Sequence, residues 1–260
     1  MRLSVITVCR NARETIGEAL SSVHRQSHPA IEHIVIDGAS SDGTLDVLRA
    51  RQSGIARLVS EPDEGLYHAM NKGIALATGD YVGFLNADDI YAHPDVLARI
   101  AEASRGGACD AAYGDLVYVR QTDPGAVVRY WRSGPYAAGR IERGWMPAHP
   151  TFFVRTALLR KLGGFDTRYR YQADYELMVR LFLKERISSA YVPEVLVRMR
   201  AGGHTNRSLR NVYRGNMEAY RACIDNGTSV SPVFILQKMF SRLPQFFARP
   251  PPQHMPPGWP

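Results

Sequence analysis

The sequence predicts an α/β fold in which helices flank a mostly parallel β-sheet. The main observation is an alternation, over roughly the first 110 residues, of short β-branched runs with stretches whose apolar residues recur every three or four positions. Composition is the second observation, because 45% hydrophobic and 22% charged residues are typical of a folded globular protein. Length is the third, because 260 residues suit one substantial domain followed by a tail.

The N-terminal part is predicted to contain four strand-and-helix units. The expected elements, in order, are strand 3–8, helix 16–23, strand 34–36, helix 45–48, strand 58–59, helix 66–77 and strand 81–85. Pro94 is expected to begin the next helix, at a position where its missing N–H costs nothing. Parallel sheets of this kind bind ligands at the carboxyl ends of their strands, so function is expected in the loops that follow them.

Beyond residue 110 the alternation weakens. Residues 111–119 and 151–154 predict strands, and a helix is expected to start at Asp174. Residues 131–145 are rich in Gly, Arg and aromatic residues without a clear period. We interpret them as a long loop, which in a compact domain is usually a lid or a binding loop.

The cysteines and the apolar segments exclude several classes of protein. Cys9, Cys109 and Cys223 lack the spacing of a zinc site or a disulfide framework, so reduced thiols are expected. The apolar N-terminal run is too short for a signal peptide, and no window holds about 20 uncharged apolar residues. We therefore expect a cytoplasmic protein with no membrane span.

The first chemically suggestive group is Asn86-Ala87-Asp88-Asp89, which directly follows a predicted buried strand. Two carboxylates at such a position are costly unless a cation neutralises them, and Mg²⁺ or Mn²⁺ shared with diphosphate oxygens would do so. The alternative is a polar turn that caps the following helix, because Asp pairs are common in turns.

Asp37 ends a different strand of the same predicted sheet, in a Gly- and Ser-rich loop suited to hydrogen bonds with a base or a ribose. The sequence contains neither a GxGxxG fingerprint nor a P-loop. A nucleotide site here would therefore depend on a metal ion to hold the phosphates.

Five segments together resemble family-2 glycosyltransferases of the GT-A fold, over roughly residues 3–205, and they appear in the order and approximate spacing of that family. They are Ser4-Val-Ile-Thr-Val-Cys-Arg-Asn11, Val35-Ile-Asp-Gly-Ala-Ser-Ser-Asp-Gly-Thr44, Asp63-Glu-Gly-Leu-Tyr-His-Ala-Met-Asn-Lys-Gly73, Ala77-Thr-Gly-Asp-Tyr81 and Asn86-Ala-Asp-Asp89. The resemblance implies a GT-A type sheet with a Rossmann-like nucleotide-binding half and an acceptor-binding half.

The resemblance also implies roles in donor binding. The aspartate that matches Asp37 contacts the nucleotide base in the family, and Asn11 ends the neighbouring loop. Asp63, Asn71 and Lys72 belong to the segment that lines the nucleoside.

The last of the five segments occupies the place of the family's metal-binding DXD motif. Asn86 replaces the first aspartate of that motif, so Asp88 is expected to be the main metal ligand and Asp89 the second. The metal is expected to be Mg²⁺ or Mn²⁺.

A sixth segment, Gly163 to Leu177, looks like the acceptor side of the family, and the general base there matches Asp174. The family often has Glu immediately before the base, where this chain has Ala173. The alternative is that Asp174 only caps its helix. His149 is expected to contact the diphosphate or the acceptor, and His204 to close over the diphosphate, although both could instead be structural.

We therefore expect an inverting glycosyltransferase that uses a nucleotide-diphosphate sugar, with UDP favoured by resemblance. The acceptor is expected to be a saccharide or a lipid-linked saccharide in the synthesis of cell-surface polysaccharide or glycolipid. One carboxylate suffices for inversion, whereas retention through a covalent intermediate needs a second one. A sugar nucleotidyltransferase and a catalytically silent nucleotide-sugar-binding module are the alternatives.

The predicted domain organisation is a GT-A catalytic domain over 1–205, a basic helical extension over 206–248 and a disordered Pro-rich tail over 249–260. Seven basic and two acidic residues from 206 onward carry +5 of the net +7, and no nucleic-acid-binding motif accompanies them. The extension also has apolar residues at helical steps, with Lys238 and Arg242 between them. Two interpretations stay open: it lies on the inner face of the cell membrane, or it packs on the domain.

Overall fold

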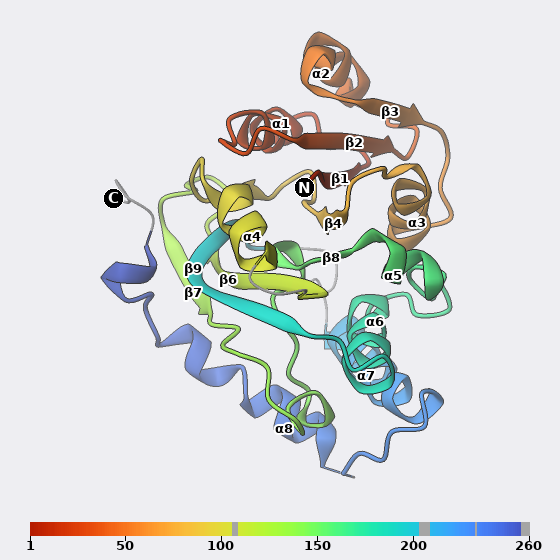
Figure 1. Cartoon of the computed structure of the whole chain (residues 1–260), viewed down its shortest axis with the longest axis vertical. Helices are drawn as coiled ribbons and strands as arrows, with labels where there is room; N and C mark the ends of the chain where they lie inside the picture. Colours follow the sequence, from red (N-terminus) through yellow and green to blue (C-terminus); the bar gives the residue numbers. More distant parts are fainter. Residues whose placement is uncertain (106–108, 203–208, 232, 256–260) are drawn as a thin grey trace.

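The computed structural model describes residues 1–105, 109–202, 209–231 and 233–255 (Figure 1). Within these ranges nine strands form one sheet in the order β3-β2-β1-β4-β8-β6-β9-β5, and β7 pairs with β6 outside this path. The mixed α/β class predicted from the sequence is confirmed.

The N-terminal half contains the predicted alternation of strands and helices. Its elements are β1 (Leu3–Cys9), α1 (Ile16–His24), β2 (Ile31–Asp37), α2 (Thr44–Ala50), η1 (Gln52–Gly54), β3 (Arg57–Ser60), α3 (Leu66–Leu76) and β4 (Tyr81–Phe84). All residues of β1 are buried, as expected for a strand covered by helices on both faces. The parallel register sets Cys9 opposite Asp37, and Asp37 opposite Ser60, so that these three strands end side by side.

The second half of the sheet mixes both strand directions. Its elements are β5 (Ile90–Tyr91), α4 (Val96–Arg105), β6 (Ala111–Val119), β7 (Val127–Trp131), η2 (Ile141–Arg143), η3 (His149–Thr151), β8 (Phe153–Arg155), α5 (Thr156–Lys161), α6 (Ala173–Val179), the π-helix η4 (Arg180–Lys184) and β9 (Ser189–Arg200). β8 runs antiparallel to both β4 and β6, and β9 runs parallel to β6. Helix α4 begins two residues after Pro94, which lies in the preceding turn rather than at the first helical position.

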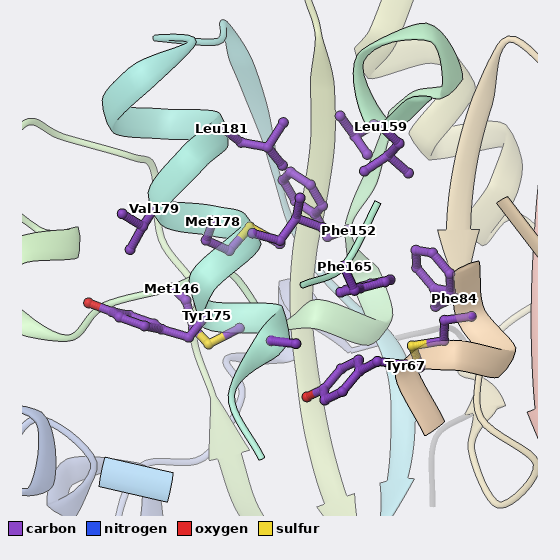
Figure 2. Packing of buried hydrophobic residues seen from close by; sticks show 14 of the residues in the cluster. Tyr67, Phe84, Met146, Phe152, Leu159, Phe165, Tyr175, Met178, Val179 and Leu181 are labelled. Carbon is purple, nitrogen blue, oxygen red and sulfur yellow. The ribbon is translucent and has the colours of Figure 1, made fainter. Parts of the chain in front are cut away.

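The hydrophobic core between these halves joins α3, α6 and the sheet (Figure 2). The Phe165 ring lies 5.3 Å from that of Tyr67 on α3 and 5.2 Å from that of Phe84 on β4, measured between centroids. Asn71 on α3 bonds the backbone of the same residue in both directions. Its Nδ2 donates to the Phe165 carbonyl and its Oδ1 accepts from the Phe165 N–H, each at 2.8 Å. These contacts fix the turn before α6 against the N-terminal half of the protein.

The C-terminal segment continues with α7 (Leu209–Asp225), α8 (Phe234–Phe240), η6 (Leu243–Phe246) and η7 (Pro252–His254). Figure 1 shows it, in blue, running along the side of the molecule opposite α1 and α2. Phe234 is fully buried against Tyr175 and Tyr220, and Arg129 Nε donates to Gln245 Oε1 at 2.8 Å. The segment therefore packs on the domain.

Two observations bear on the end of this segment. In the described part of the tail, 249–255, the His254 side chain is largely buried, 3.8 Å from Asp115 Oδ2. On α8, the Lys238 side chain is 1% exposed, which agrees with packing on the domain, one of the two interpretations left open above. Proline-rich sequence excludes regular helix and strand but does not prevent packing in an irregular conformation.

No helix in the described ranges combines the length and the apolarity needed to cross a bilayer.

Candidate active site

The ends of β1, β2 and β3 hold a buried carboxylate. Asp37 is fully buried, and it accepts hydrogen bonds from the Ser60 hydroxyl at 2.7 Å, from the Ser40 N–H at 3.1 Å and from the Ser40 hydroxyl. The Cys9 thiol, whose pKa is raised by burial and by Asp37, points at the same carboxylate. Asp37 is thus held in one orientation at the edge of the sheet where parallel strands bind ligands.

Asn11 joins the loops that follow β1 and β2. Its Oδ1 accepts from the Ser41 N–H at 3.0 Å, and its own N–H donates to the Ser40 hydroxyl at 2.8 Å. Its φ of 51° lies in the left-handed region, which asparagine tolerates better than most residues. The two loops therefore form one unit.

Lys72 on α3 lies at the edge of this unit. Its ammonium pairs with Glu61 at 2.6 Å and with Asp63 at 2.8 Å, and these contacts raise the pKa of the lysine. The sequence analysis singled out Asp63 and Lys72 as separate residues, and the structure brings them together. The amide of Asn71, predicted to line the nucleoside, forms hydrogen bonds in both directions with the backbone of Phe165.

The residues after β4 form a compact acidic turn. Asp89 is fully buried and Asp88 partly buried, and the amide Nδ2 of Asn86 donates to Asp89 Oδ2 at 3.2 Å. Burial raises the pKa of Asp88. Burial, and next the neighbouring Asp88, raise the pKa of Asp89 well above its ordinary value. The charged form of this pair is therefore poorly stabilised by the surrounding protein.

This turn fits a divalent cation by the chemistry of its donors. The Oδ1 atoms of Asn86 and Asp89 are buried without a hydrogen-bond partner in the described part of the chain. Hard cations such as Mg²⁺ and Mn²⁺ bind such oxygens, and a cation would neutralise the two carboxylates. The described residues contain no group of three or more His, Cys, Asp or Glu side chains that could hold a metal. Ligands from outside the protein, such as phosphate oxygens or water, would have to complete the coordination.

Arg200, at the end of β9, supports the acidic turn from below. Its guanidinium donates to the carbonyl of Asp88 at 2.9 Å and pairs with Glu18 on α1. It therefore holds the backbone of the turn, and its charge partly opposes the rise in the pKa values of Asp88 and Asp89. No motif in the sequence pointed to Arg200, because it is 112 residues away from Asp88.

Asp174 lies in the first turn of α6 and is partly exposed. Its Oδ1 accepts from the hydroxyl of Tyr67 at 3.3 Å and from the N–H of Tyr175 at 2.8 Å, which leaves Oδ2 without a hydrogen bond among the described residues. The N-cap residue of α6 is Gln172, so Asp174 does not occupy the cap position considered as its alternative role. One oxygen is fixed by the protein and the other is available to a ligand.

His149 lies on the same side of the core as Asp174. Its ring stacks on Phe84 with centroids 5.3 Å apart and meets the edge of Phe165 at 5.6 Å. Burial lowers the pKa of His149, and Asp174 partly opposes this shift. The imidazole is therefore neutral at pH 7. His204, the other histidine singled out in the sequence, lies outside the described residues.

Tyr118 on β6 is a partly buried tyrosine with charged groups around it. Burial raises the pKa of its phenol, the guanidinium groups of Arg129 and Arg242 lower it, and Asp89 and Asp174 both raise it. The Arg129 guanidinium lies 4.6 Å above the Tyr118 ring. The sequence analysis did not identify Tyr118.

Residues 4–162 match the family described as Glycosyl transferase family 2. An uncharacterized glycosyltransferase of Mycobacterium tuberculosis is 35% identical over 190 residues, covering 70% of this chain and 69% of the relative. A PGL/p-HBAD biosynthesis glycosyltransferase of Mycobacterium bovis is 30% identical over 197 residues, covering 74% of each protein.

Solved structures show the same fold at lower sequence identity. TarS 1–349 of S. aureus superposes with a TM-score of 0.67 at 18% identity, covering 92% of this chain and 71% of that protein. The mannosyltransferase PcManGT of Pyrobaculum calidifontis gives a TM-score of 0.63 at 21% identity, covering 93% of this chain and 69% of the other.

Proposed function

The chain belongs to glycosyl transferase family 2, a family of enzymes, and we propose that it transfers a sugar from a nucleotide-diphosphate donor to an acceptor hydroxyl with inversion. The observation that carries this proposal is the buried acidic turn after β4, in which the Oδ1 atoms of Asn86 and Asp89 have no hydrogen-bond partner among the described residues. Asp174, in the first turn of α6, is proposed to belong to the same site.

The nucleoside is proposed to bind across the ends of β1 and β2. Asp37 is buried there in a fixed orientation, and Asn11 holds the two loops together, which suits recognition of a base by hydrogen bonds. Lys72, already neutralised by Glu61 and Asp63, is proposed to position this wall rather than to bind phosphate. We favour UDP as the nucleotide. TarS has been crystallised with UDP-GlcNAc, although PcManGT has been crystallised with GDP-Man and Mn²⁺.

Asp88 and Asp89, with the amide oxygen of Asn86, are proposed to hold Mg²⁺ or Mn²⁺. When bound, the ion would neutralise the developing charge on the leaving diphosphate. The support from this chain is the pair of buried oxygens without partners and the raised pKa values of both carboxyl groups. Arg200 keeps the turn in place through the Asp88 carbonyl.

Asp174 is proposed to act as the general base. The acceptor hydroxyl attacks the anomeric carbon on the face opposite the diphosphate, and its proton passes to Oδ2, the oxygen without a partner among the described residues. The bond from the anomeric carbon to the diphosphate breaks as the new glycosidic bond forms, which inverts the configuration. His149 is neutral and stacked on Phe84, so we propose that it forms a wall of the sugar pocket.

The acceptor is proposed to be a saccharide or a lipid-linked saccharide of a cell-surface polysaccharide or glycolipid. The M. bovis relative is described as a PGL/p-HBAD biosynthesis enzyme, and that similarity supports the proposal. We further propose that the protein is cytoplasmic and contacts the inner membrane face through 233–247. Leu236, Phe240 and Phe247 are exposed there, the last by 84%, and Arg242 and Arg249 lie beside them. Exposed aromatic and basic side chains together favour an anionic bilayer surface.

The main proposal is tested with a panel of UDP-, GDP- and dTDP-sugars. The cognate donor is expected to raise the melting temperature in the presence of Mn²⁺ more than with EDTA, because ligands that bind only the folded state stabilise it. Transfer to a saccharide acceptor should give a product whose anomeric configuration, read by NMR, is opposite to that of the donor. Retained configuration would contradict the inverting mechanism, and neither binding nor turnover with any donor would contradict the proposal as a whole.

Membrane contact is tested by co-sedimentation with vesicles of phosphatidylcholine alone or with added phosphatidylglycerol. We expect binding only to the anionic vesicles, and a marked reduction when Phe240 and Phe247 are both changed to serine. The Tyr213→Ser variant is the control, because this equally exposed aromatic residue lies on α7. Equal recovery of the double variant and the native chain on anionic vesicles would contradict the proposed surface.

A further inference from the structure

Lys238 is a buried lysine that the proposed mechanism does not use. It lies on α8, in the C-terminal segment, and its side chain is 1% exposed although its neighbours Gln237 and Met239 are exposed. Lysine is among the residues least often buried without a charged partner. Within the described ranges no carboxylate forms an ion pair with Lys238, so something other than a salt bridge keeps it inside.

The contacts of Lys238 surround the first turn of α6. Its Nζ donates to Gln172 Oε1 at 2.6 Å and lies 4.4 Å above the centroid of the Tyr175 ring. Gln172 is the N-cap residue of α6, and Tyr175 directly follows Asp174. One ammonium group therefore contacts side chains on both sides of the proposed general base.

The other neighbours of Lys238 leave it little freedom to move. Gly144 has a φ of 84°, and a Cβ added to it would lie 2.6 Å from the Cβ of Lys238, so the 141–144 loop packs directly on the lysine. The Tyr175 hydroxyl in turn donates to the carbonyl of Ile141 at 2.5 Å. The loop, α6 and α8 thus meet at Lys238.

We propose that Lys238 is a positioning residue for Asp174: by holding Gln172 and the Tyr175 ring it fixes the first turn of α6 and the direction of the Asp174 carboxylate. This inference rests on the proposed role of Asp174. If Lys238 has this role, α8 belongs to the catalytic domain, which the sequence analysis predicted to end at residue 205. Displacement of a catalytic group by about 1 Å can reduce turnover about 100-fold, so such positioning has a measurable effect.

Electrostatics also connect Lys238 with its surroundings. Burial and Arg242 lower the pKa of Lys238, while Asp174 and Cys223 raise it.

The test compares Lys238→Met, which keeps most of the side-chain volume, with Lys184→Met, a surface change at the end of η4. For Lys238→Met we expect kcat for sugar transfer to fall about 10- to 100-fold, with the KM for the donor within about twofold of the native value. A fall in kcat without a rise in the donor KM is the signature of a displaced base, because donor binding does not involve α6. Lys184→Met should leave both quantities unchanged.

A second variant, Gln172→Ala, removes the acceptor of the Lys238 hydrogen bond, and its kcat and donor KM are measured in the same way. It tests the same contact independently if Lys238→Met does not fold. In the double variant, the fall in kcat should be markedly smaller than the product of the two single-variant falls, because both substitutions remove the same hydrogen bond. Native kcat in the single variants, or a loss that appears in the donor KM and not in kcat, would overturn this inference while leaving the proposed function intact. A native chain that transfers no sugar would instead overturn the proposed function.

Discussion

The donor side and the acceptor side of the candidate site are built in different ways. On the donor side, polar residues at neighbouring strand ends bond to one another, as Asn11 does to Ser41 and Asp37 to Ser60. On the acceptor side, Asp174 is surrounded by residues from distant parts of the chain, including Tyr67 and His149. The donor-side bonds therefore join consecutive strand-and-helix units, 23 to 30 residues apart, whereas the bond from Tyr67 to Asp174 spans 107 residues.

Because of this difference, mutations on the two sides are expected to have different effects. Changes on the donor side should alter nucleotide and metal affinity or local stability. Changes around α6 should alter turnover with little effect on donor binding. Three variants test this division, and each can contradict it.

The largest effect is expected for Asp174→Asn, which keeps the shape of the side chain but removes the base. Turnover should fall by about 10²- to 10⁴-fold, the usual contribution of a general base, while donor affinity measured by calorimetry stays unchanged. Asp166→Asn is the matched control, because this aspartate lies in the loop that precedes α6 and pairs with Arg168. Native turnover in Asp174→Asn would contradict the proposal that Asp174 is the general base. A loss of donor affinity as large as the loss of turnover would contradict the proposed separation of donor binding from turnover.

The acidic turn after β4 should show a pH-dependent effect of intermediate size. Because burial and Asp88 raise the pKa of Asp89 in the folded state, its protonated form stabilises the fold. That contribution is complete below the ordinary aspartate pKa of about 4 and is lost as the pH rises through the folded-state value. In EDTA, the native chain should therefore become less stable than Asp89→Asn as the pH rises, by about 1.4 kcal/mol for each unit of pKa difference.

Urea unfolding of both proteins between pH 4 and 8 measures this difference. Saturating Mn²⁺ with a nucleoside diphosphate should reverse it, because only the carboxylate form of the native turn binds the ion well. If the stability difference between the native chain and Asp89→Asn changes with pH in the same way with and without Mn²⁺, the proposed cation site at Asp88 and Asp89 is wrong.

The smallest effect is expected at Asn11, where two loops are joined by one side chain. Asn11→Gly keeps the left-handed backbone but removes the bond to Ser41, so the free energy of unfolding should fall by about 1 kcal/mol. The KM for the donor should rise a few-fold at constant kcat. Asn11→Ala adds backbone strain and should be less stable than the glycine variant. A fall in kcat without a change in KM would show that the donor side also serves the chemistry.

The same division explains what the sequence could predict. The strands and helices up to residue 105 were predictable because the buried strands contain short apolar, β-branched runs and the helices have apolar residues every three or four positions. Asp37, Asp88 and Asp89 follow such strands directly, so their location at the sheet edge could be inferred. Asp174 was identified by family resemblance alone, since nothing in its local sequence distinguishes a base from a helix cap.

Other elements had no clear local pattern. β9 is twelve residues long, but Pro193 interrupts its alternation near the point where its register with β6 shifts. Arg200 and Lys238 reach the site from far away in sequence, and Tyr118 lies within a strand whose other residues are nearly all buried. Apolar pattern alone also could not show that α8 has both a buried lysine and an exposed aromatic side.

The reciprocal pairing of Asn71 with Phe165 has a consequence for synthesis on the ribosome. The two residues are 94 positions apart, so the amide of Asn71 lacks its native partner until the later segment has emerged. At about 5 to 20 residues per second, that interval lasts about 5 to 20 seconds. A nascent chain that has completed β4 therefore still exposes one side of α3 to water, and the two halves reach their final contact only late in translation.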